Sequence, residues 1–160
     1  MSSNNNPSLE FHLSLPLSSS PHLQRGYLLI KDQPSSAGVK LLATSGCRGN
    51  QFQNSWTLKG RGPLPPSSKL VPFRYKVSTQ RLWLPQVRGV EGSFYAIAPF
   101  TVQLGKINRG DFGVHFDANA PGSAGCIVLL LQEHWDIFRE LMAEFRLNGH
   151  QQIPLEVLYS

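Results

Sequence analysis

Glycine and proline are spread so evenly along this chain that only one long stretch is free of both. The 160 residues include 14 glycines and 12 prolines, and the 23 residues between Gly125 and Gly149 contain neither. No other interval exceeds 12 residues. Because both residue types interrupt regular structure, a long helix has room only near the C-terminus. The rest is predicted to form short strands and turns, which excludes a helical bundle and disfavours a doubly wound α/β sheet.

The hydrophobic pattern agrees with this division. Alternating or continuous apolar residues predict strands at 9–17, 27–31, 39–44, 71–77, 81–84, 93–98, 101–107, 112–116, 126–131 and 153–158, with a short one around 55–58. A helix is expected at 133–147, with apolar residues on one face: Trp135, Phe138, Leu141, Met142 and Phe145. We therefore expect a mainly β fold with one helix, in which residues 1–8 form a polar tail and residues 9–160 a single domain.

Charge is unevenly distributed around a net value of +5. Residues 1–110 contain 13 basic and three acidic residues, whereas residues 111–160 contain two basic and seven acidic residues. The first part therefore favours an anionic partner. The segment 45–69 is rich in Gly, Pro and Ser, and a loop of this length is typical of a binding site.

Several classes of protein are disfavoured by simple counts. No run of 18 apolar residues is present, so no membrane span is predicted. The first 21 residues have neither an early basic residue nor a continuous apolar stretch, so we expect no secretory signal. Two cysteines, Cys47 and Cys126, are too few for a disulfide scaffold.

The stretch 109–129, RGDFGVHFDANAPGSAGCIVL, carries the clearest chemical signal. His115 ends one predicted strand and Cys126 starts the next, with Asn119, Pro121 and glycines in the connection. An imidazole beside a thiol can remove its proton and make a nucleophile. Gly125 would allow a substrate to approach the backbone, and the N–H groups of residues 125 and 126 would then face a developing oxyanion.

These residues resemble the active-site signature of the L,D-transpeptidase (YkuD-like) family. In that family a His-Gly segment precedes a Ser-His-Gly-Cys-Ile/Val-Arg motif. The string 121–127, PGSAGCI, is closer to a divergent branch that includes injected bacterial toxins and phage-encoded proteins. Two further segments match this branch, Ser45-Gly46 and the GRGPLP segment at 60–65. The resemblance covers roughly residues 25–160.

The resemblance implies a role for each matching residue. Cys126 is the nucleophile, His115 the general base, and Ser123 the motif serine, whose backbone or hydroxyl helps to orient the imidazole. From the sequence itself, the Ser123 hydroxyl could instead hydrogen-bond within the turn. Gly125 contributes to the oxyanion hole. Ala124, Val128 and Phe116 depart from the main family's His, Arg and Gly. Since the missing arginine binds substrate carboxylate, Arg109 or Arg61 is a candidate replacement. Asp117 and Ser45 are two further candidate substrate-binding residues.

The family's fold is a β-sandwich of mixed sheets. Its substrates are peptidoglycan stem peptides, which are cleaved at a terminal D-amino acid through a thioacyl-enzyme that is passed to an amine or to water. The resemblance thus implies a cysteine peptidyltransferase or hydrolase that needs no metal or organic cofactor. Because the substrate lies outside the cytoplasmic membrane, delivery by phage lysis, a virion or a secretion system is expected, with any immunity or delivery partner undefined.

Three other interpretations of the sequence stay open beside this one. A non-catalytic wall- or virion-associated binding protein would explain the altered motif. The basic residues near Tyr75 and Trp83, which are Arg74, Lys76 and Arg81, are compatible with nucleic-acid binding. Solvated charges on alternating strands explain them better, so no nucleic-acid partner is expected. A zinc site from His115, Asp117, Cys126 and His134 matches no familiar spacing. Without this motif, Cys126 would be interpreted as a buried structural cysteine and His115 as an ordinary histidine at a strand end.

Overall fold

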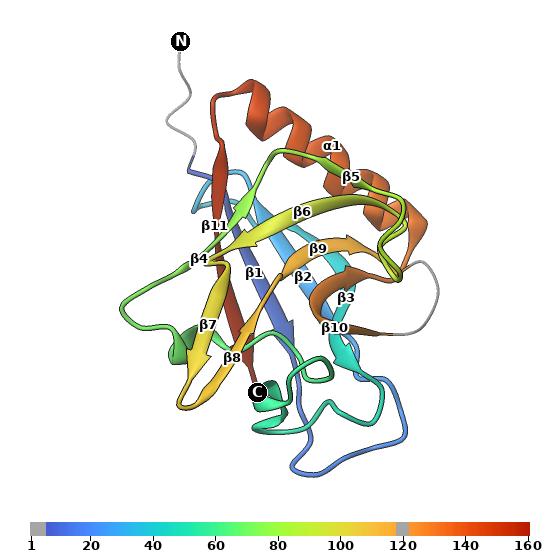
Figure 1. Ribbon diagram of the computed structural model, residues 1–160. Coiled ribbons are helices and arrows are strands. Elements are labelled where there is room, and N and C mark those ends of the chain that lie inside the picture. Colours follow the sequence, from blue (N-terminus) through green and yellow to red (C-terminus); the bar gives the residue numbers. More distant parts are fainter. Residues whose placement is uncertain (1–5, 118–121) are drawn as a thin grey trace.

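The computed structural model describes residues 6–117 and 122–160, and these form a strand-rich molecule with one α-helix (Figure 1). The strands are β1 (Ser8–Leu13), β2 (Gly26–Lys31), β3 (Val39–Cys47), β4 (Tyr75–Ser78), β5 (Leu82–Leu84), β6 (Gly92–Ala98), β7 (Thr101–Leu104), β8 (Ile107–Gly110), β9 (Gly113–Phe116), β10 (Gly122–Leu129) and β11 (Gln152–Tyr159). The helices are α1 (Gln132–Leu147) and two single 3₁₀ turns, η1 (Ser55–Thr57) and η2 (Ser67–Lys69).

Nine strands form one mixed sheet that closes on itself. Their order is β4-β11-β1-β2-β3-β10-β9-β6-β5, and β4 also pairs with β6. The β1–β11 and β9–β10 pairs are parallel, and the others are antiparallel. β7 and β8 form a separate hairpin, which projects from the closed sheet near the loop between β3 and β4 (Figure 1). The mainly β class with mixed pairing is confirmed, and the two expected layers belong to one curled sheet.

Period-two patterning gives the paired strands β1 and β11 one buried face each. Leu9, Phe11 and Leu13 are buried on one face of β1, and the paired strand β11 buries Leu155 and Val157. The other face carries polar side chains.

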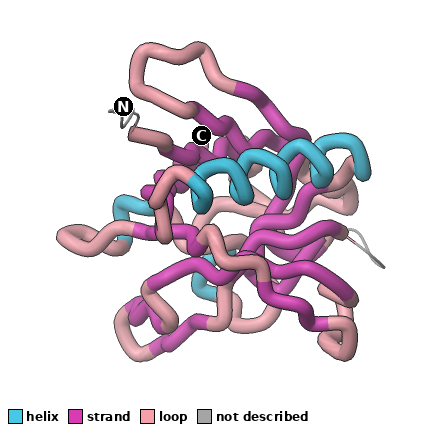
Figure 2. Tube along the Cα trace, turned by 90° about the horizontal axis from the view of Figure 1, so that it is seen from above, coloured by secondary structure: helices cyan, strands magenta, loops and turns pink. Residues whose placement is uncertain are grey.

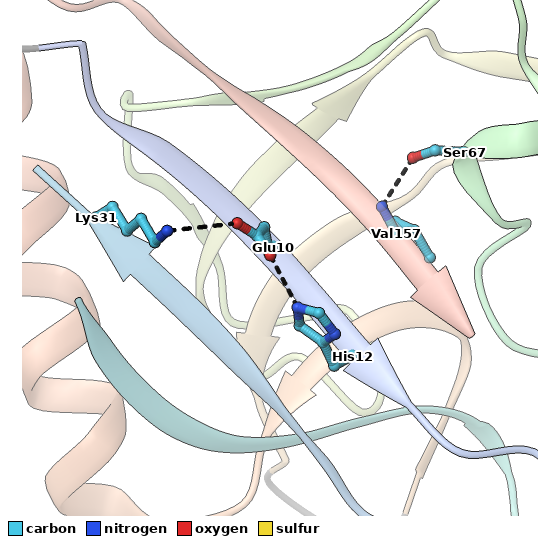
Figure 3. A network of polar contacts seen from close by, with 5 residues as sticks. All are labelled: Glu10, His12, Lys31, Ser67 and Val157. Carbon is cyan, nitrogen blue, oxygen red and sulfur yellow. Dashed lines mark hydrogen bonds and ion pairs between the residues drawn. The ribbon is translucent and has the colours of Figure 1, made fainter. Parts of the chain in front are cut away.

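Figure 3 shows the polar contacts of these strands. Glu10 pairs with His12 at 2.9 Å and with Lys31 of β2 at 4.0 Å. Ser67 Oγ of η2 accepts a 2.7 Å hydrogen bond from the Val157 N–H of β11. η2 is thereby attached to the sheet.

Helix α1 covers the sheet with the apolar face that the sequence predicts (Figure 2). Trp135, Phe138, Met142 and Phe145 are buried. Tyr95 of β6 makes edge contacts with the Trp135 and Phe138 rings at centroid distances of 5.9 and 5.1 Å. Among the described residues, no helix is both long enough and apolar enough to cross a bilayer.

Three local expectations are wrong. Residues 55–57 form a 3₁₀ turn rather than a strand. The strand expected at 71–77 begins only at Tyr75, and Val71 and Phe73 are 77% and 73% exposed because no neighbouring strand covers them. The strand expected at 101–107 is two strands, since the chain turns at Gly105, where φ is +63°.

Candidate active site

The segments that carry the motifs meet at the buried side chain of Arg109 in β8. Its guanidinium donates to the carbonyls of Trp56 and Pro63 at 2.7 and 2.6 Å. It also donates to the carbonyls of Gly62 and Ala124 at 3.0 and 3.1 Å. One cation therefore joins the 60–65 segment to the strand that carries Cys126.

Ser45 makes a second connection between the same segments. Its hydroxyl accepts a 2.9 Å hydrogen bond from the Leu64 N–H and donates to the Gly125 carbonyl at 3.2 Å. Gly125 has a φ of +128°, and a Cβ there would lie 2.6 Å from the Arg109 guanidinium. Glycine is thus required by conformation and by space.

Cys126 lies on an open cleft of about 440 Å³ between β10, the β7–β8 hairpin and the loop after η1. Lys59 and Gly60 line it from the loop, and Ala124 lines it beside the cysteine. The hairpin and its ends contribute Phe100, Thr101, Asn108, Arg109, Gly110 and Asp111. This volume is in the range of small-ligand sites.

The thiol of Cys126 donates to the Asp111 carbonyl at 3.8 Å. Burial raises the pKa of this thiol to about 11, and the Asp111 carboxylate raises it further, against the opposing effects of the Gly113 N–H and Arg109. In the free protein the group is therefore a thiol at neutral pH, not a thiolate.

His115 lies on β9, the strand next to β10, and is only 5% exposed. Its ring stacks on Phe94 at a centroid distance of 6.0 Å, and Nδ1 lies 2.9 Å from the Phe116 carbonyl oxygen. Because a carbonyl only accepts, the proton sits on Nδ1 and the lone pair on Nε2. Burial lowers the pKa of His115 despite this hydrogen bond, so the ring is neutral at pH 7.

Sheet register places the strands that carry the two predicted catalytic residues side by side, and His115 is not among the residues that line the cleft. His115 pairs with Val128 in the parallel β9–β10 ladder, and Cys126 lies two residues before Val128. One strand across and two residues along corresponds to about 8 Å between Cα atoms. Within the described part of the chain, no hydrogen bond joins the imidazole to the sulfur, so proton transfer requires the thiol to leave the Asp111 carbonyl.

The Ser123 hydroxyl hydrogen-bonds within the turn, which is one of the two roles that the sequence allows. It donates to the Cys126 carbonyl at 2.5 Å and accepts from the N–H groups of Gly46 and Gly125 at 3.2 and 3.3 Å. It thereby holds the turn before Cys126. The Gly125 N–H is thereby engaged, and the backbone N–H that acts on the sulfur is that of Gly113. The predicted contributions of Asn119 and Pro121 lie outside the described residues.

The candidate substrate-binding residues have separate positions. Arg109 lines the cleft but commits four of its five N–H donors to carbonyls, and Ser45 is fully buried. Arg61 is exposed beside the cleft, where its carbonyl accepts from the Cys47 N–H at 2.7 Å. Asp117 is not among the cleft residues; it accepts a 3.1 Å hydrogen bond from the Gly122 N–H, and burial raises its pKa. These contacts give Arg109, Ser45 and Asp117 structural roles.

The second cysteine also lies near this turn. Cys47 donates to the Ser123 carbonyl at 3.1 Å, and burial raises its thiol pKa although Arg61 and Arg109 oppose the shift. Both cysteines are free thiols.

The residues considered for zinc do not form a cluster in the described structure. His134 accepts a 2.8 Å hydrogen bond from the Leu42 N–H through Nδ1. Over residues 6–117 and 122–160, no three His, Cys, Asp or Glu side chains are grouped as metal ligands.

The sequence analysis did not identify three residues of this site. Lys59 contributes a cation to the cleft, Phe94 packs on His115, and Gly113 accommodates the Phe94 ring, since a Cβ there would lie 2.0 Å from it. Only the lysine had a local signal, because it lies in the long basic loop. The other two depend on the β6–β9 register.

In comparisons with known families, characterised proteins and solved structures, nothing matches this chain.

Proposed function

We propose that the protein is a cysteine acyl-transfer enzyme acting on peptidoglycan stem peptides by L,D-transpeptidase-like chemistry. The observation that carries this proposal is the position of the Cys126 thiol on an open cleft with Lys59 at its rim. A neutral imidazole, with its proton on Nδ1, lies on the neighbouring strand β9. A cationic rim suits a peptide that bears carboxylates.

The proposed reaction begins when the substrate displaces the thiol from the Asp111 carbonyl. His115 Nε2 takes the thiol proton while the sulfur attacks the peptide carbonyl carbon. The oxyanion forms near the Gly113 N–H, a fixed donor beside the sulfur. As the intermediate collapses, the C–N bond breaks and His115 returns the proton to the departing amine. An amine or water then attacks the thioester and releases Cys126.

Substrate binding has to supply part of the activation, because the resting thiol has a pKa of about 11. His115 is suited to a base role because burial keeps it neutral and its Nδ1 hydrogen bond fixes the tautomer. Phe94 and the Phe116 carbonyl hold the ring in one orientation.

The test is incubation with purified muropeptides followed by mass spectrometry of the products. The wild type should remove or exchange the terminal D-amino acid. Cys126→Ser should lose turnover, and His115→Gln should lose about 10²–10⁴-fold if it retains the wild-type melting temperature. Cys47→Ser is the matched control and should keep its activity. Unchanged muropeptides with the wild type, or equal turnover by Cys126→Ser, would refute the proposal.

A second candidate function is non-catalytic binding to the wall or a virion. It is favoured by the protonated thiol on Asp111, with no hydrogen bond to His115 in the described structure. In that case wild type and Cys126→Ser would bind isolated cell walls equally, and neither would change the stem peptides.

A further inference from the structure

A second cavity of about 440 Å³ lies between α1 and the connection from β4 to β5. We call it the arginine pocket, because Arg81, Arg139 and Arg146 line it together with Thr79, Tyr95 and others. None of its lining residues belongs to the Cys126 cleft. It is therefore a separate site on the molecule.

The three guanidiniums come from two different parts of the fold. Arg139 and Arg146 lie seven residues apart on α1, so helical spacing places them on one side, with the small Ala143 between them. Arg81 approaches from the strand connection and lies over the Trp83 ring at 5.6 Å. Tyr95 of β6 lines the same cavity, and its ring is fixed by Trp135 and Phe138.

Most of this positive charge is not neutralised within the protein. Arg139 pairs with Asp136 at 3.0 Å. In the described ranges, neither Arg81 nor Arg146 forms an ion pair, and Arg146 makes only a long 3.4 Å hydrogen bond to Thr79 Oγ1. Three cations that face one cavity repel each other, and a bound anion would reduce this repulsion, since the one paired carboxylate, Asp136, is not among the lining residues.

One further observation concerns the spacing of these cations. The charges of Arg81 and Arg139 both act on the Tyr95 phenol, lowering a pKa that burial raises, so both guanidiniums are close to the same point.

We propose that the arginine pocket binds the phosphate group of a small phosphorylated molecule. A carboxylate has two oxygens and is matched by one bidentate guanidinium, whereas a phosphate monoester has three terminal oxygens and up to two negative charges. It can therefore accept hydrogen bonds from all three arginines. A cavity of this volume is larger than a phosphate ion alone, so the phosphate is attached to an organic body held beside Tyr95.

The test follows the backbone amides of residues 79–81 by NMR during titration with glucose 6-phosphate, AMP and inorganic phosphate, each against acetate at equal ionic strength. The two organic phosphates should produce saturable shifts, with inorganic phosphate weaker and competing. Arg81→Gln and Arg146→Gln should each weaken binding about tenfold. Arg48→Gln removes the same charge from an exposed loop position outside the pocket and should change affinity less than about twofold.

Several results would overturn the proposal. These are no saturable shift with any phosphorylated probe, equal affinity for acetate, tightest binding of free phosphate, or equal binding by wild type and the two arginine variants. A response only to a polyanion such as heparin would identify a macromolecular surface instead. Cys126→Ser should bind the phosphates like the wild type, so this test succeeds or fails independently of the proposed acyl transfer.

Discussion

At Cys126 the sulfur is held as a thiol by its surroundings. Burial is the largest cause of its raised pKa, and a thiol that donates to a backbone carbonyl gains nothing from ionising. The proposed nucleophile is therefore unreactive until a substrate fills the cleft. This arrangement protects an accessible cysteine from alkylation and oxidation in the absence of substrate.

Alkylation of Cys126 should follow its raised pKa. In a Cys47→Ser background, the iodoacetamide rate should rise about tenfold per pH unit from neutral pH and level off near pH 11, because only the thiolate reacts. Since the folded pKa exceeds the ordinary 9.0, the folded state loses stability as pH rises from 9.0 to about 11. Cys126→Ser should remove that loss in denaturant titrations. A rate plateau below about pH 8 would contradict this account.

Gly113 is required because the Phe94 ring fills the space where a side chain would be. A Cβ at this position would lie 2.0 Å from the ring, which also stacks on His115. Gly113→Ala should lower the free energy of unfolding by about 1–3 kcal/mol. At Gly92 on β6 the nearest atom to a new Cβ is 3.7 Å away, so Gly92→Ala should stay within about 0.5 kcal/mol. Equal urea midpoints for both variants would refute this packing.

At the scale of elements, Arg109 explains how irregular segments are held against regular strands. Its side chain is 2% exposed and binds carbonyls from η1, the 62–63 segment and β10. Trp56, Gly62 and Pro63 lie outside the strands, and Ala124 lies in the irregular part of β10, so a single cation satisfies acceptors that no ladder pairs. The floor of the cleft depends on this contact.

Replacing Arg109 should destabilise the whole domain. Arg109→Met keeps an unbranched apolar stem but leaves four carbonyls without a donor, and we expect a loss of about 3 kcal/mol or more. Arg109→Lys retains the charge with three donors and should lose less. Arg74 is exposed, so Arg74→Met is the matched control. If thermal melts of Arg109→Met and Arg74→Met coincide, the connecting role of Arg109 is wrong.

The sequence predicts an element when the alternation of buried and exposed residues within that element is enough to identify it. Period-two alternation located the start of β1 within one residue, although the strand ends at Leu13 rather than at 17. The 3.6-residue pattern located α1 within one residue at its start. Alternation around Val71 had the same form, yet no strand pairs there, because pairing depends on partners far away in the chain. Within the site, Cys126 and His115 stand out through a local motif. Phe94 and Gly113 do not, since only strand register brings them together.

For the molecule as a whole, closure of the sheet sets the position of the cleft. β4 pairs with both β11 and β6, so the sheet has a fixed curvature, and the β7–β8 hairpin projects at one end beside the basic loop. Lys59 and Arg109 of the cleft therefore come from the basic first 110 residues, whereas Cys126 comes from the acidic remainder of the chain.

Lys59 should affect substrate binding rather than the chemical step. Lys59→Gln should raise the KM for a carboxylate-bearing muropeptide severalfold with kcat unchanged, because its charge attracts substrate and transition state equally. The difference from wild type should shrink as salt increases. Lys69→Gln on η2 removes an equal charge away from the cleft lining and should leave KM unchanged. A fall in kcat, or an equal effect of Lys69→Gln, would contradict this role.

The central claim is that Cys126 forms a thioester with a peptidoglycan stem peptide. Rapid acid quenching during turnover of purified muropeptides, followed by intact-protein mass spectrometry and peptide mapping, measures this directly. The account predicts an added mass equal to the acyl part of the donor peptide, located on Cys126 and absent from Cys126→Ser. Turnover with no adduct on Cys126, or an adduct on Cys47 instead, would contradict it.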